Sequence, residues 1–430
     1  MLRYFSYDLA GSSNGRTLVF GTSNLGSSPS PATITIRYLS TKSLQSNIWK
    51  FAIHSITSKR TYMTFLTIFF LTMPNATARM IGMISAAGQI AGFLFEIPSG
   101  YISDRIGHKN ALVFAKFLTI LSTLCYILAN SIAWFFVGGI LMAIGIAFLS
   151  GTANAFMHDT LNDLGKGDQY AHVMGRIKSL GFAVPIIFIL LLPVIAQTNF
   201  RLAFLVVLLL DIVGLFVVMS FKKPAASSII EEVSIGNLKK TFRDWYKAGW
   251  VRYVLVGVIS FGISFGAVAG FKNPYQELIG FSISSLGILW AISRVFISGI
   301  SLWSGFIYKK ISYKDLIILR ATGYSICFLV IGLFPNMWIT AGAFIIVTVL
   351  QWGLGAVFNQ HNLDFIKTSN SKATLLSVNS LIEKMMSAII ALAMGFIVAG
   401  YSYMVGYLFM GIALLTLVVV SFFYLPKNSY

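Results

Sequence analysis

Charged side chains interrupt several long apolar stretches of this sequence. Lys59, Arg60, Asp211 and Arg294 each lie well inside such a stretch. If the stretches cross a membrane, each charge costs at least about 2.5–3.5 kcal/mol on insertion, so such residues usually serve a function. A planar guanidinium suits a carboxylate or phosphate, and a carboxyl group removed from water can carry a proton. The four residues are therefore candidates for substrate binding or coupling.

Each cationic candidate also has a structural alternative. Lys59 and Arg60 could line a central cavity, or they could lie at the membrane interface if the first helix begins near Thr61. The second possibility leaves too few residues before Pro74, because a crossing needs about 20. Arg294 could bind substrate, or it could pair with an acid on another helix.

Asp211, Gln351 and Trp352 allow two interpretations each. Asp211 could carry a proton, or it could pair with a cation in the N-terminal half of the chain. An amide and an indole suit a polar organic solute, but both also form hydrogen bonds between helices. Because cations outnumber acids within the apolar stretches, we expect anionic or zwitterionic solutes to be preferred over cationic ones. A neutral cavity is the alternative.

The elements that position these residues are apolar stretches of membrane-spanning length. Of the 430 residues, 57% are hydrophobic and 11% charged, against about 25% charged in soluble domains. We predict an all-α integral membrane protein of about twelve transmembrane helices. The expected spans are Ile48–Met73, Met80–Ile102, Ala111–Ala129, Ile132–Phe156, Met174–Ala196, Leu202–Phe221, Val251–Phe271, Ile283–Ile307, Leu316–Phe334, Trp338–Phe358, Val378–Ala399 and Tyr403–Leu425.

Basic residues are distributed unevenly between these spans. The loops after the even-numbered spans are rich in Lys and Arg, whereas the other loops carry Arg79, Arg201 and Lys272 at most. By the positive-inside rule, both termini are then expected in the cytoplasm. The expected location of the protein is the cytoplasmic (inner) membrane. The formal charge of +18 is explained by these loops, so no nucleic-acid partner is expected. The longest loop, residues 222–250, is expected to be a cytoplasmic linker between halves at 48–221 and 251–425.

A short motif follows the second expected span. It reads Gly100-x-x-x-Asp104-Arg105-x-Gly107-x-Lys109. Gly100 would allow close helix approach, and Gly107 a tight turn. Asp104 could accept hydrogen bonds from the exposed amides of a helix N-terminus. Arg105 and Lys109 could form ion pairs across a seam between the two halves.

A second copy of the motif follows the eighth span, 205 residues later, where Gly305 and Lys310 replace Gly100 and Arg105. Two matching halves are typical of transporters built from repeats. The motif, its place and its repetition resemble the major facilitator superfamily over Ile48–Leu425. The resemblance implies two six-helix halves and a gate formed by the motif residues together with Glu96. His108 departs from the family pattern, which usually has a cation there.

Residues 1–41 differ from the rest of the sequence. They are rich in Gly and Ser and lack the apolar core of a signal peptide. One interpretation is a disordered tail. The other is a spurious extension, because Ser12–Arg16 and Gly26–Pro29 can be encoded by codons that resemble the two conserved loop sequences of a transfer-RNA gene. The native start would then lie near Arg37–Leu44.

These features together predict a secondary active transporter of a small organic solute, working by alternating access. We expect proton coupling and function as a monomer, with export as one possible direction. No cofactor and no metal are expected, and the two cysteines, Cys125 and Cys327, should be buried thiols. A membrane-embedded transferase, a receptor or a channel is the alternative. The sequence lacks the clustered acids of such an enzyme, and the two-half repeat argues against a receptor or channel.

Overall fold

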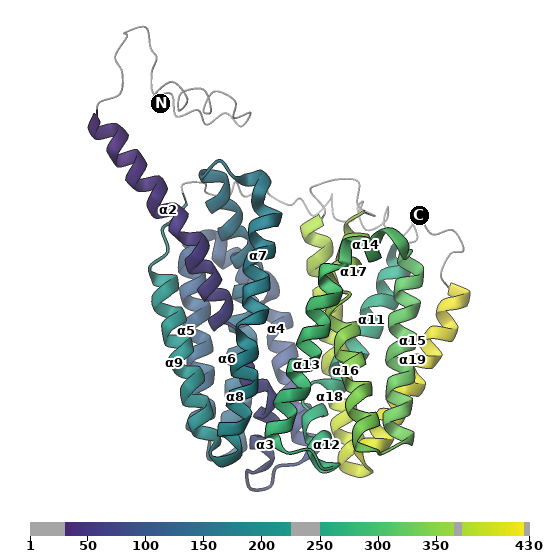
Figure 1. Cartoon of the computed structure of the whole chain (residues 1–430). Helices are drawn as coiled ribbons and strands as arrows, with labels where there is room; N and C mark the ends of the chain where they lie inside the picture. Colours follow the sequence, from purple (N-terminus) through teal and green to yellow (C-terminus); the bar gives the residue numbers. More distant parts are fainter. Residues whose placement is uncertain (1–30, 225–249, 365–371, 425–430) are drawn as a thin grey trace.

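The computed structural model describes residues 31–224, 250–364 and 372–424, which form a bundle of helices from which the first part of α2 projects (Figure 1). Among these described residues, ten helices are long and apolar enough to cross a membrane, and one bent pair makes an eleventh if the pair is a single span. The first half contains α2 (Pro31–Thr57), η1 (Thr61–Thr64), α3 (Leu66–Leu71), α4 (Ala78–Ile106), α5 (His108–Ile127), α6 (Ile132–Asp163), η2 (Gly167–Gln169), α7 (Tyr170–Ala183), α8 (Pro185–Thr198) and α9 (Phe200–Met219). The second contains α11 (Trp250–Val268), α12 (Lys272–Leu278), α13 (Ile283–Leu302), α14 (Ser304–Lys310), α15 (Tyr313–Leu333), α16 (Met337–Trp352), α17 (Gly355–Asp364), α18 (Lys372–Gly400) and α19 (Tyr403–Tyr424).

Polar residues between the apolar stretches fix where several helices begin. The side chain of Asn199 accepts hydrogen bonds from the first backbone amides of α9, and Asn336 does the same for α16. Ser282 and Ser312 cap α13 and α15. Such caps satisfy backbone donors that the helix itself leaves unpaired. The outer faces carry exposed apolar side chains, as expected of helices that face lipid.

The helices form the two predicted halves, which lie side by side in Figure 1. In the first half α5 packs against α6 and α9, and in the second α15 packs against α11 and α19. The halves meet where α4 packs against α18 and where α8 packs against α13. The prediction of an all-helical membrane protein is confirmed, with ten or eleven candidate spans among the described residues. Residues 1–30 and most of the linker at 222–250 lie outside the described residues, whereas residues 31–41 belong to α2.

The first predicted span is not one continuous helix. It consists of α2, η1 and α3, with a break at Ser58–Arg60. Spans five, eight and ten are also interrupted, near Val184, Trp303 and Gly353. A proline at position 185 explains the first of these three breaks, because it lacks a backbone donor. The hydrophobic pattern alone does not reveal such breaks.

The bundle has two distinct ends. We call them the Asn75 end, where α3 and α12 lie at the bottom of Figure 1, and the Asp104 end, which holds the signature loop (residues 100–109). At the Asn75 end the halves touch backbone to backbone. A Cβ atom on Gly82 would lie 2.5 Å from the carbonyl oxygen of Ala391, and one on Gly287 would lie 2.5 Å from that of Ile189. The seam is therefore closed at this end.

Candidate functional site

Asp211 is the centre of a buried ionic network in the first half. Its side chain is fully buried. The guanidinium of Arg60 donates two hydrogen bonds to its carboxylate, at 2.7 and 3.0 Å. Lys116 donates a third at 3.2 Å, and the hydroxyl of Thr123 a fourth at 3.1 Å. Asp211 and Arg60, both candidates for coupling or binding, are thus held together with α5 inside one half.

Lys116 also explains the break in the first span. Its ammonium group donates a hydrogen bond of 2.9 Å to the carbonyl oxygen of Thr57, the last residue of α2. This contact satisfies a carbonyl that loses its helical partner where the helix ends. A Cβ atom on Gly214 would lie 2.8 Å from the Lys116 ammonium, so a glycine leaves room for this lysine. The sequence analysis missed Lys116, although a lysine within the span Ala111–Ala129 was a detectable signal.

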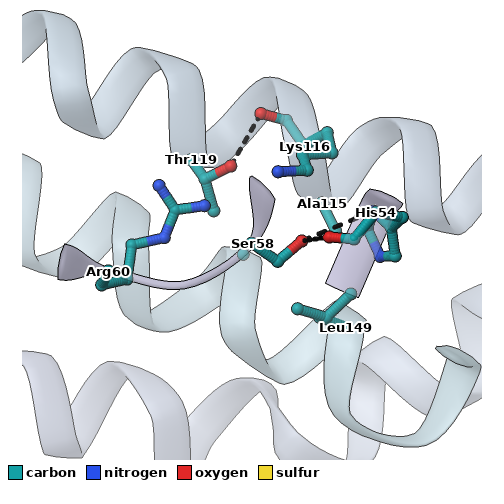
Figure 2. A pocket seen from close by; sticks show the side chains of 8 residues that line it. His54, Ser58, Arg60, Ala115, Lys116, Thr119 and Leu149 are labelled. Carbon is teal, nitrogen blue, oxygen red and sulfur yellow. Dashed lines mark hydrogen bonds between the residues drawn. The ribbon is translucent and has the colours of Figure 1, made fainter. Parts of the chain in front are cut away.

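A small cavity adjoins this network (Figure 2). The side chains of His54, Ser58, Lys116 and Leu149 lie around it, and its volume is about 10 Å³. The Nε2 atom of His54 is buried without a hydrogen-bond partner. A space of this size holds about one water molecule. The cavity can therefore hydrate the network, but it is too small for an organic solute.

The side chain of Lys59 contacts a different helix from the side chain of its neighbour Arg60. Its ammonium lies 4.4 Å from the ring centre of Phe182 on α7, and the guanidinium of Arg294 on α13 lies 5.3 Å from the same ring. We call these three residues the Phe182 seam, because they join the two halves of the protein. Across the described ranges, neither Lys59 nor Arg294 has a carboxylate within salt-bridge distance. Both side chains are half-buried.

Gln351 and Trp352 are neighbours in sequence but face different surroundings. Gln351 is buried and donates a hydrogen bond of 2.8 Å to Ser264 on α11, which is a contact between helices. Trp352 is 53% exposed and meets the rings of Phe261 and Phe265 edge-on. Only the indole therefore presents a free surface.

Glu96 forms the main ionic contact between the halves. Its carboxylate pairs with Lys384 of α18, whose ammonium also donates to the carbonyl oxygen of Gly92 at 3.3 Å. Glu383, the adjacent residue, is half-buried and makes no hydrogen bond or ion pair in the described part of the chain. The charged groups that act on it are Arg320, Lys384 and Glu96.

Most residues of the signature loop are exposed or half-buried in this structure. Asp104 and Arg105 are exposed, and the guanidinium of Arg105 stacks on Tyr101 at 4.5 Å. Gly107 has φ of 84°, which agrees with the tight turn expected of a glycine. Lys109 is half-buried, and Lys310 of the second copy is exposed. Among the described residues, Asp104 makes no hydrogen bond or ion pair with the other half.

The helix contacts expected at the glycines of this loop and of its second copy are not formed in this structure. The space next to Gly100 is empty, as it is next to Gly305. Within the described residues, no neighbouring helix therefore approaches these glycines closely in this structure. Asp159 of α6 pairs with His108 of this loop at 3.5 Å.

Two buried cations in the second half escaped the sequence analysis. Arg320 is 3% exposed; it stacks on Phe358 at 4.9 Å and donates to the hydroxyl of Tyr324 at 3.3 Å. A shift of 205 residues, the spacing of the two motif copies, places Arg320 one position before Lys116 of the first half. Lys272 was assigned to an outer loop, but it is 3% exposed within the bundle. The wrong assignment arose because span seven bends by 45° between α11 and α12.

The chain matches a known family over most of its length. The sequence profile of the Major Facilitator Superfamily matches residues 52–369. The chain is 23% identical over 232 residues to YxaM of Bacillus subtilis (strain 168), an uncharacterized MFS-type transporter. The aligned stretch covers 52% of this chain and 57% of that protein. It is 32% identical over 80 residues to the sugar transporter ERD6 of Arabidopsis thaliana. This shorter alignment covers 19% of this chain and 16% of that protein.

Solved structures share the fold at low sequence identity. The crystal structure of the nucleoside transporter NupG superposes with a TM-score of 0.72 at 11% identity, covering 89% of this chain and 98% of that one. The D-xylose-proton symporter gives 0.66 at 13% identity, with 90% and 97% covered. With the profile match and the two-half architecture, these similarities show that the chain belongs to the major facilitator superfamily, a family of membrane transporters and not of enzymes.

Proposed function

We propose that this transporter carries a small organic anion or zwitterion, which binds at the Phe182 seam. The observation that supports this proposal is the meeting of Lys59 and Arg294 at one ring, from opposite halves, with no carboxylate of the described residues in salt-bridge distance. An aromatic ring attracts a cation but does not neutralise its charge. Two half-buried cations therefore favour an anionic partner, and charge-assisted hydrogen bonds would hold it.

The position of the seam also suits transport. Lys59 belongs to the first half and Arg294 to the second. An anion bound by both would link the halves, so its binding would favour conformations in which they approach. The exposed Lys178, which acts electrostatically on Lys59, adds positive charge beside the seam. The competing arrangement is a neutral cavity in which Lys59 extends to the interface.

Transport by purified protein in liposomes tests the proposal. The panel contains citrate, succinate and benzoate as anions, glucose and uridine as neutral solutes, and ethidium as a cation. We expect the anions to be moved best, and Arg294→Gln to lose anion transport selectively. Arg79→Gln is the matched control, because Arg79 also stacks on a ring, that of Phe396, but lies exposed outside the seam. Preferential transport of the cation, or equal loss of all three classes in Arg294→Gln, would contradict the proposal.

We further propose that the protein lies in the cytoplasmic (inner) membrane and that its Asp104 end faces the cytoplasm. The distribution of Lys and Arg between loops supports this orientation. The structure would then be the inward-facing state, closed at the Asn75 end. In intact cells, an impermeant thiol reagent should label a cysteine that replaces Asn199 and should not label Asp104→Cys. The reverse labelling pattern would overturn the orientation.

Proton coupling completes the proposal, with Glu383 as the proton carrier in preference to Asp211. Asp211 is engaged by two cations, whereas Glu383 has no ion pair in the ranges that the structure describes. A carboxyl group that is removed from water, and that no ion pair holds in its charged form, takes up a proton more readily. Glu383→Gln should make transport independent of an imposed pH gradient. The same assay with gradients of either sign distinguishes export from uptake, and undiminished coupling in Glu383→Gln would exclude this residue.

A further inference from the structure

The bend in span seven buries a group of polar residues at the Asn75 side of the bundle. Lys272, Asn273 and Gln276 of α12 are 3%, 6% and 0% exposed. We call these three residues, with Trp290 of α13 and Thr348 of α16, the Lys272 cluster. The ammonium of Lys272 lies 5.0 Å from the ring centre of Trp290 and donates a hydrogen bond of 3.2 Å to Thr348.

The Lys272 cluster contains more hydrogen-bond donors than it uses. A lysine ammonium has three N–H groups, and one of those of Lys272 is bonded. Both polar atoms of the Gln276 amide are buried, and neither has a hydrogen-bond partner among the described residues. Gln276 lies one helical turn after Lys272, on the same face of α12. Among the described residues, no carboxylate pairs with Lys272, and no other charged group acts on it.

The unpaired groups of the Lys272 cluster favour the binding of an anion. An unpaired buried charge is costly, and each buried polar group without a partner adds about 1–3 kcal/mol. An anionic ligand would remove several of these costs at once. We propose that the Lys272 cluster is a second anion-binding subsite, which takes a carboxylate of the transported solute. This proposal rests on the proposed function, since it assumes an anionic solute.

The two subsites lie along one helix face. Trp290 and Arg294 are one turn apart on α13, which is about 6 Å along the axis. Asn273 closes the Lys272 cluster toward the other half, because its side chain donates to the carbonyl oxygen of Met63 at 2.8 Å and accepts from Trp290 at 3.1 Å. Separation of the halves at the Asn75 end would break the bond to Met63 and uncover Lys272. The solute would then meet Lys272 from the Asn75 side and Arg294 from the Asp104 side.

Thermal unfolding of the purified protein tests this subsite. The melting temperature is measured at low salt, in sodium chloride, and in acetate, succinate or citrate at the same ionic strength. We expect a carboxylate to raise it more than chloride does, with the difference reduced in Lys272→Met, which keeps the Phe182 seam, and retained in Lys272→Arg. Lys223→Met, at an exposed lysine, should behave as the parent. An equal rise in chloride would indicate an adventitious ion only and would overturn the subsite, as would no rise with any carboxylate.

The ligand-free variants separate a binding role from a structural one. Lys272→Met should unfold at the parental temperature or above, because methionine removes an unpaired buried charge. If it does not fold, Gln276→Leu decides: it should raise the melting temperature without ligand and reduce the rise caused by carboxylate. A lower melting temperature or an unchanged carboxylate effect would overturn the subsite. Loss of anion transport in Arg294→Gln but not in Lys272→Met would refute this subsite alone, whereas loss in neither would refute the proposed function as well.

Discussion

Arg60 and Asp211 are joined by two parallel hydrogen bonds across 151 residues of sequence. Lys116 adds a second cation to the same carboxylate. The three charged groups hold the broken first span against α5 and α9. Lys59, one residue before Arg60, is instead directed to the Phe182 seam. The break at Ser58–Arg60 thus separates a cation that stabilises one half from a cation that is available to a ligand.

The first prediction concerns the stability of this network. Asp211→Asn should lower the free energy of unfolding by about 3–5 kcal/mol, because it leaves two buried cations without a counter-charge. Thermal unfolding in detergent measures the change. Combining Asp211→Asn with Lys116→Met should recover part of the loss. Asp168→Asn, at an exposed aspartate, is the control. A melting temperature of Asp211→Asn equal to that of Asp168→Asn would show that the network contributes little.

The sequence was sufficient to predict the fold but only part of the site. Apolar length and the repeated motif reveal the two halves, since both depend on local composition. The break in the first span depends on Lys116, which is far from Thr57 in sequence and contacts it only in the folded bundle. Gln351 and Trp352 illustrate the same limit. Adjacent helical residues point about 100° apart, and only packing decides which of them is buried.

The conformational state was also beyond the sequence. Gly100 was expected to pack closely, yet the close contacts occur at Gly82 and Gly395 at the opposite end. A sequence pattern reports residues that serve every state of a transporter, whereas one structure contains the contacts of one state. Gly100 is therefore still a prediction for the state in which the Asp104 end closes.

A second prediction concerns the ion pair of Glu96 and Lys384. Either Glu96→Gln or Lys384→Gln should slow transport, because each leaves a half-buried charge unpaired at the contact of α4 with α18. Exchange of the two charges, Glu96→Lys with Lys384→Glu, should restore part of the rate. The comparison is made in the liposome assay with the solute that the parent moves best. No recovery in the exchanged variant would mean that the residues act separately.

A third prediction concerns closure at the Asn75 end. Gly82→Val should prevent the close packing of α4 on α18, because even a Cβ atom would lie 2.5 Å from the carbonyl oxygen of Ala391. The variant should favour the state that is open at this end. Spin labels on Thr72→Cys and Tyr401→Cys, in a protein whose buried cysteines are replaced, report the separation. Gly342→Val is the control, since the space beside that glycine is open. An unchanged distance distribution in Gly82→Val would contradict the assignment.

The last prediction concerns Asp104. Its exposed carboxylate has no partner in the described part of this state, so Asp104→Asn should leave the melting temperature unchanged. Transport should nevertheless fall, because the carboxylate is expected to accept hydrogen bonds when the Asp104 end closes. A hydrogen bond to a charged group contributes about 1.5–3 kcal/mol, which corresponds to roughly a tenfold loss or more in the population of the closed state. Asp104→Glu should retain part of the rate. Because folding and transport are measured on the same preparation, a parental rate in Asp104→Asn would exclude a gating role, and a lowered melting temperature would identify a structural role.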